Sequence, residues 1–159
     1  STGSLGQGLS CGIGMALAAQ RDGASFRTFV LIGDGESQEG QIWEAALYAG
    51  SNALPGIVAI VDRNDVQLSS KTDDAVGLGD LAAKWRAFGW STHEVDGHDM
   101  ASLTPALERC REEAAKGPVA LIARTIKGKG VSFMEGRFEW HGKAPNDAEF
   151  LSAMAEVNA

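Results

Sequence analysis

Residues 29–35, Phe-Val-Leu-Ile-Gly-Asp-Gly, place a carboxylate between two glycines directly after four apolar residues. A second apolar run, residues 57–61, ends in a similar way at Asp62-Arg63-Asn64. Short apolar runs without alternation are typical of parallel strands buried on both faces. Because ligands of open α/β sheets bind at the carboxyl ends of the strands, the residues after these two runs are the first candidates for a site.

Two further apolar runs, residues 92–95 and 119–123, end at Asp96-Gly97 and Arg124-Thr125. Helical patterns separate the runs, and we expect helices near residues 5–17, 41–53, 80–88, 101–116 and 147–157. Residues 127–146 are rich in glycine and charge and predict a loop. Alternation of strands and helices predicts an α/β fold with a mostly parallel sheet.

The composition is that of a globular domain, with 159 residues, 44% of them hydrophobic. Acidic residues outnumber Lys and Arg by 21 to 14, which disfavours binding to nucleic acid or to anionic membranes. No apolar run approaches the roughly 20 residues that span a bilayer. Cys11 and Cys110 have no metal-site spacing and predict reduced structural thiols in a cytoplasmic protein. The start at Ser1, inside a glycine-rich segment, leads us to expect an N-terminally truncated domain.

Asp34 and Asn64 form the strongest candidate metal site. Both follow predicted parallel strands, with 28 residues between Gly35 and Asn64. A carboxylate and an amide oxygen, completed by carbonyls or water, suit Mg²⁺ and leave room for oxygens of a diphosphate. The alternative is a plain turn in which Asp34 caps the next helix. The spacing of the two motifs favours the metal site.

The segment 33–45, GDGESQEGQIWEA, together with Asn64, resembles the transketolase family. That family combines the thiamine diphosphate motif with the later Gln-Glu-Gly and Trp-Glu-Ala. Segments 60–64 (IVDRN), 84–90 (KWRAFGW), 95–99 (VDGHD) and 140–146 (WHGKAPN) resemble transketolases that are split into two polypeptides. The resemblance implies the three-layer α/β/α fold of a thiamine diphosphate domain, with residues 1–159 as one partial diphosphate-binding domain.

The resemblance also assigns roles to particular residues. It implies that Asp34, Asn64 and the Val66 carbonyl hold Mg²⁺, and that His141 lies near the diphosphate and the substrate in a catalytic role. It matches Glu39 with a glutamate buried at a subunit interface. The residues that it implies for thiamine diphosphate are Gly3, Ser4, Leu5, Asp34, Gly35, Asn64 and His141.

The implied activity is transfer of a two-carbon ketol unit between sugar phosphates. The implied partner is a C-terminal transketolase subunit with the pyrimidine-binding domain, in a homodimer or heterotetramer. Because that domain, its ring-activating glutamate and the early histidines are not identifiable here, we expect the chain alone to be inactive. The alternatives are another thiamine diphosphate enzyme, such as 1-deoxy-D-xylulose-5-phosphate synthase, and a non-catalytic subunit.

Several other patterns have simpler interpretations. Residues 127–130 (KGKG) are compatible with a sugar-phosphate site, although a solvated loop is the favoured interpretation. Gly8 and Gly12 predict close packing of a helix. His93 and His98 do not form a metal pair, and Asp99 is expected to cap the helix that follows it.

Overall fold

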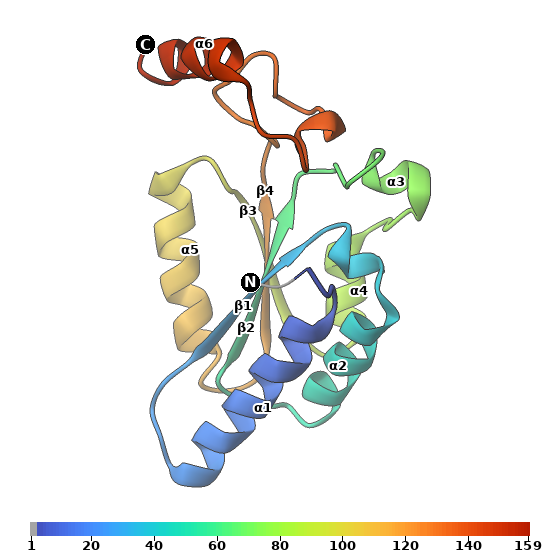
Figure 1. The fold of residues 1–159 in the computed structure, drawn as a ribbon. Helices are drawn as coiled ribbons and strands as arrows, with labels where there is room; N and C mark the ends of the chain where they lie inside the picture. The colour runs from blue at the N-terminus through green and yellow to red at the C-terminus, as the bar shows by residue number, and fades with distance from the viewer. Residues whose placement is uncertain (1–2) are drawn as a thin grey trace.

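Four parallel strands form the centre of the structure, a computed structural model that describes residues 3–159. The strands are β1 (Thr28–Gly33), β2 (Ile57–Arg63), β3 (Ser91–Asp96) and β4 (Val119–Arg124), in the spatial order β1-β2-β4-β3. Figure 1 shows this sheet nearly edge-on. Every pairing is parallel, so the four predicted strands and their parallel arrangement are confirmed.

Helices cover both faces of the sheet. On one face lie α1 (Gln7–Asp22), α2 (Gly40–Ser51) and α4 (Leu81–Ala87), and on the other lies α5 (Met100–Glu113) (Figure 1). The predicted α/β/α layering is therefore confirmed. The segment beyond β4 rises over the carboxyl ends of the strands and ends in α6 (Asp147–Val157) (Figure 1).

Shorter elements fill the connections. The 3₁₀ turn η1 (Glu36–Gln38) follows β1, and the one-turn helix α3 (Thr72–Ala75) follows β2. The predicted loop at 127–146 contains only the 3₁₀ turn η2 (Phe138–Trp140). None of the helices in residues 3–159 is long and apolar enough to cross a membrane.

Helix ends follow from local capping chemistry. The Asp99 carboxylate accepts a hydrogen bond from Ala101 N at 3.0 Å, which confirms the predicted cap of α5. Gly6 has φ +82°, a left-handed conformation that glycine adopts freely, and α1 begins only after it. The predicted start at Leu5 was therefore too early, because Leu5 precedes this glycine turn.

The two cysteines lie in different environments. Cys110 is fully buried on α5, and burial raises the pKa of its thiol to about 11. It therefore fits the predicted structural thiol. Cys11 lies exposed on α1, so burial does not support the same interpretation for it.

The small residues of α1 allow the helix to lie directly on β1. A Cβ atom added to Gly12 would come within 2.4 Å of Val30 Cγ2 and 3.2 Å of Ile57 Cδ1. Gly14, two positions further along α1, would meet nothing within 4 Å. The expected close packing is thus found, with the sheet as the neighbour of the helix.

This difference predicts opposite effects of one substitution at the two glycines. Gly12→Ala should lower the free energy of unfolding by about 1–3 kcal/mol because the new methyl group overpacks the contact with Val30. Gly14→Ala should raise it by about 0.5–1 kcal/mol because alanine has the higher helix propensity. Urea unfolding of both variants measures the effects, and equal shifts for the two would contradict the packing described here.

Candidate functional site

A cavity of about 680 Å³ opens at the carboxyl ends of β1 and β2. It contains all the predicted site residues except Ser4, which lies between the lining residues Gly3 and Leu5. The residues that line it are Gly3, Leu5, Gly33, Asp34, Gly35, Glu36, Gln38, Glu39, Asp62, Asn64, Val66, Gln67, Leu68, Lys127 and His141. Segments far apart in the sequence therefore meet where the strand-end rule predicted a site.

Asp34 is the buried centre of this cavity, with 2% of its surface exposed. Its Oδ1 accepts a hydrogen bond from Gly35 N at 2.7 Å, and its Oδ2 accepts one from Asp65 N at 2.5 Å. Burial raises the pKa of the Asp34 carboxyl above its ordinary value, and these backbone hydrogen bonds offset only part of that rise. A cation beside the carboxylate would favour its charged form.

Asn64 lies in the tight turn that follows β2. Its Oδ1 accepts a hydrogen bond from Val66 N at 3.1 Å, and Asp65 between them has φ +59°. This Asx turn buries the Val66 side chain to 7% exposure. Among residues 3–159 the Val66 carbonyl oxygen accepts no hydrogen bond, so it is available as an oxygen ligand.

The groups around Asp34 fit a hard cation better than a transition metal. No three His, Cys, Asp or Glu side chains within residues 3–159 gather as a metal-binding group. The available atoms are instead a carboxylate, an amide and a carbonyl oxygen, which suit Mg²⁺ with water or phosphate completing the coordination. Thr72 adds a buried hydroxyl near Asp34. This hydroxyl has no partner with the geometry of a hydrogen bond.

The charge of the lining also bears on the ligand. Four carboxylates, those of Asp34, Glu36, Glu39 and Asp62, line the cavity, against one lysine, Lys127. A diphosphate on its own would be repelled by these carboxylates. A divalent cation would offset the repulsion.

The glycine at position 35 is explained by space and not by backbone conformation. Its backbone is right-handed helical, with φ −60° and ψ −37°, so the turn does not require glycine for its dihedral angles. A Cβ atom there would lie 3.1 Å from Gln67 Cβ, so glycine provides space instead. Its N–H, which the resemblance assigned to the diphosphate, donates to Asp34 in this structure.

Glu36 joins two parts of the cavity wall. Its carboxylate accepts hydrogen bonds from Gly6 N at 2.9 Å and from Gly33 N at 3.2 Å. It thereby holds the Gly3–Leu5 segment against the end of β1. No local sequence pattern indicates this contact, because Gly6 lies 30 positions before Glu36.

The comparison with known proteins identifies the family. Residues 1–157 match the family described as transketolase, thiamine diphosphate binding domain. This chain belongs to the transketolase family. The resemblance seen in residues 33–45 and 60–64 is thus confirmed at the level of the family.

Several relatives are named as transketolase subunits. The chain is 43% identical to an apulose-4-phosphate transketolase subunit of Phocaeicola vulgatus, over 99% of this chain and 56% of that protein. It is also 43% identical to a 6-deoxy-6-sulfo-D-fructose transketolase subunit of a Clostridium species, over 99% and 57%. The chain therefore spans a little over half the length of these relatives.

A solved structure gives the same fold. The transketolase of Campylobacter jejuni matches with a TM-score of 0.90 and 28% identity, over 99% of this chain and 26% of that chain. The transketolase-type diphosphate-domain fold predicted from the sequence is therefore confirmed.

The transketolase-family chain brings Lys127 and His141 to the cavity from its long loop. Lys127 O accepts a hydrogen bond from Gly136 N at 2.9 Å, which closes the loop between them. His141 ends η2 and is exposed, with its backbone N–H donating to Phe138 O at 2.9 Å. Residues 127–130 were expected mainly as a solvated loop, but Lys127 lines the cavity.

Glu39 lies at the rim of the same cavity. Its side chain is exposed in the transketolase-family chain, and its Cβ lies 3.3 Å from the place that a Cβ on Gly6 would occupy. Glu39 therefore packs beside the glycine that precedes α1. Its burial at a subunit interface, implied by the resemblance, stays a prediction.

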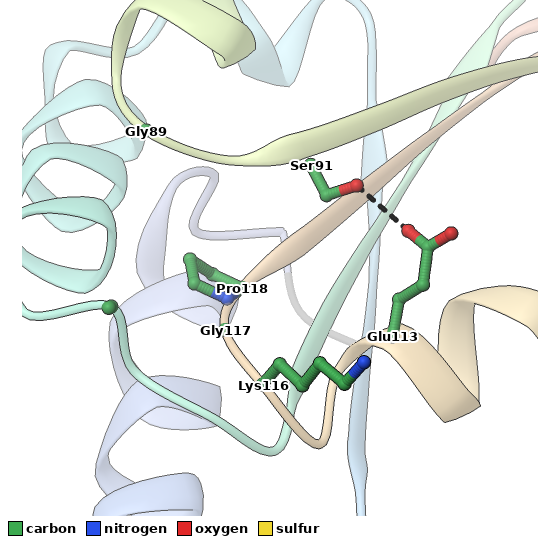
Figure 2. A pocket seen from close by; sticks show the side chains of 7 residues that line it. Gly89, Ser91, Glu113, Lys116, Gly117 and Pro118 are labelled. Carbon is green, nitrogen blue, oxygen red and sulfur yellow. Dashed lines mark hydrogen bonds between the residues drawn. The ribbon is translucent and has the colours of Figure 1, made fainter.

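A second pocket lies at the opposite, amino-terminal end of the sheet (Figure 2). Ser91 Oγ donates to Glu113 Oε2 at 2.8 Å, His93 Nε2 contacts the same oxygen at 2.7 Å, and Arg109 Nε donates to Oε1 at 2.7 Å. The histidine contacts the carboxylate and not the serine, so this is no activated nucleophile. The cluster ties α5 to β3.

This cluster predicts acid-sensitive stabilisation of the transketolase-family fold. Burial alone would raise the pKa of Glu113, but hydrogen bonds from His93, Arg109 and Ser91 lower it to about 2. Because the pKa of Glu113 is lower in the folded state than in the unfolded state, where it is near 4.5, its charged carboxylate stabilises the fold fully above about pH 4.5. This stabilisation is lost as the pH falls toward 2. Glu113→Gln should thus cost about 1–2 kcal/mol at pH 7, allowing for solvent screening.

Urea unfolding between pH 7 and pH 3 measures this difference. The gap between the wild type and Glu113→Gln should narrow below pH 4.5. The exposed neighbour Glu112 provides the control, and Glu112→Gln should show no comparable change with pH. A gap that stays constant down to pH 3 would contradict the proposed ionisation of Glu113.

Proposed function

We propose that this chain supplies the Mg²⁺ and diphosphate site of a thiamine-diphosphate-dependent transketolase. The observation that carries the proposal is the meeting of Asp34, Asn64 and the Val66 carbonyl in one acid-lined cavity at the ends of β1 and β2. The Gly33↔Asp62 register brings these groups together. They are oxygen donors of the kind that Mg²⁺ prefers.

In this proposal each residue contributes binding or orientation. Asp34, Asn64 and Val66 hold Mg²⁺, which in turn holds the diphosphate. Glu36 fixes the segment Gly3–Leu5 that forms the neighbouring wall. Thiamine diphosphate, when bound, supplies the nucleophilic carbon that the reaction needs, whereas the protein supplies position and electrostatics. His141 stands at the rim as a donor to substrate.

The proposed reaction is transfer of a two-carbon ketol unit from a ketose phosphate to an aldose phosphate. The two relatives from split enzymes are named for action on apulose 4-phosphate and 6-deoxy-6-sulfo-D-fructose. This supports a ketose donor as the class of substrate and leaves the identity of the sugar to experiment. The proposed partner is a second polypeptide that carries the pyrimidine-binding domain, since relatives named as subunits imply one.

The metal assignment predicts a strict dependence of cofactor binding on Mg²⁺. Changes beside a metal ligand already cost about 10–100-fold in metal affinity. Asp34→Asn in the assembled enzyme should therefore weaken thiamine diphosphate binding by at least about 100-fold and remove its dependence on Mg²⁺. Calorimetric titration with and without Mg²⁺ measures both effects.

The control is Asp22→Asn, at the exposed far end of α1, which should bind cofactor as the wild type does. Unchanged affinity in Asp34→Asn would refute the metal site. Equal weakening in both variants would point to general destabilisation and would count against the assignment as well.

The proposal also predicts that the chain by itself does not turn over sugar phosphates. A cofactor held only through its diphosphate lacks the orientation that the reaction requires. Activity with xylulose 5-phosphate and an aldose acceptor should appear only when the pyrimidine-domain partner and any remaining part of the diphosphate domain are supplied. A coupled spectrophotometric assay tests this, and turnover by the purified chain alone would disprove it.

A further inference from the structure

The turns that follow β3 and β4 are packed tightly together. Gly97 N donates to Arg124 O at 2.8 Å. A Cβ atom on Gly97 would come within 2.5 Å of Thr125 Cγ2 and 3.1 Å of Arg124 O. The turn after β3 therefore lies directly against the start of the long loop that leads to the candidate site.

His98 fastens this loop through its side chain. The backbone N–H of Ile126 donates to His98 Nε2 at 2.7 Å. The His98 backbone N–H donates to Asp96 Oδ1 at 2.9 Å, which fixes the turn that carries the imidazole. An amide N–H can only donate, so His98 Nε2 must be unprotonated and the ring must be neutral with its proton on Nδ1.

The fastened residue is next to the cavity. Thr125, before Ile126, bonds through its hydroxyl to Asp62 and through its N–H to Arg63 O at 3.0 Å. Lys127, after Ile126, lines the cavity with Asp34 and His141. Among the hydrogen bonds of residues 3–159, that of His98 to Ile126 is thus the last one made from outside the loop before Lys127.

We propose that His98 is a positioning residue that sets the start of the 126–141 loop, and with it Lys127, by accepting a hydrogen bond from Ile126. The placement of the loop stands on the geometry alone. Its consequence for binding of thiamine diphosphate rests on the proposed function. Protonation of the ring would set two N–H groups against each other, so the contact exists only while His98 is neutral.

The charged groups around the ring come from both turns. Asp96 and Asp99 lie on the turn that carries His98, and Asp99 is occupied in capping α5. From the facing turn come Arg124, paired with Glu94 at 2.6 Å, and Lys129, paired with Glu135 at 3.7 Å. Because these charged groups are engaged elsewhere, the group bonded to His98 Nε2 is the Ile126 N–H.

The first test measures the contact itself. The chain has three histidines, so ¹⁵N spectra can assign each ring, and His98 should be the Nδ1–H tautomer at pH 7.5. Amide exchange of Ile126 should be about fivefold faster in His98→Ala, as expected for loss of a net hydrogen bond of ordinary strength. His98→Gln places an acceptor oxygen near the position of Nε2 and should restore slow exchange.

The second test concerns the site. Affinity of the assembled enzyme for thiamine diphosphate with Mg²⁺ should fall about fivefold in His98→Ala and recover in His98→Gln. His93→Gln, a change at the opposite end of the sheet, serves as the control and should behave as the wild type.

The outcomes separate the two proposals. An Nε2–H tautomer at His98, or unchanged Ile126 exchange in His98→Ala, would overturn the positioning role. If Ile126 exchanges as expected but the wild type does not bind thiamine diphosphate, the proposed function is overturned. The placement of the loop by His98 is upheld in that case. Altered exchange with unchanged cofactor affinity would refute the link between the loop and the site.

Discussion

The buried carboxylate of Asp34 is the constraint on which the site depends. A carboxylate with 2% exposure must find partners, because an unpaired buried charge is costly. Its partners are the N–H groups of Gly35, just beyond the end of β1, and of Asp65, beyond the end of β2. The pairing Gly33↔Asp62 decides this meeting, since a shift of the register would move Asp65 away from the carboxylate. Sheet register and site geometry are therefore one property of the chain.

Much of this arrangement could be predicted from the sequence because it follows local rules. The short apolar runs predicted the strands, and Asp99 predicted the start of a helix. The strand-end rule predicted that Asp34 and Asn64 would converge, since it depends only on parallel neighbours. The comparisons confirm the fold and the family, whereas the metal and the reaction stay predictions.

The contacts that escaped prediction join loops over long distances in the sequence. Glu36 bonds to Gly6 and His98 bonds to Ile126, and neither contact leaves a periodic pattern. Lys127 looked like part of a solvated loop because it begins the segment KGKG, residues 127–130. The glycine at position 35 makes room for Gln67, a contact that the sequence does not indicate either. Side-chain packing of this kind appears only when the fold is known.

The carboxylate of Glu113 and the polar groups around Asp34 differ in how completely hydrogen bonds satisfy them. At the amino end Glu113 accepts from three side chains, so its contacts are complete and serve stability. At the carboxyl end the Thr72 hydroxyl is buried without a standard partner, the Val66 carbonyl accepts nothing within residues 3–159, and burial raises the pKa of Asp34. Unsatisfied buried groups cost free energy unless a ligand completes them. A cation at Asp34 would supply the missing positive charge and a partner for the free carbonyl oxygen, which supports placing the proposed binding site at this end of the sheet.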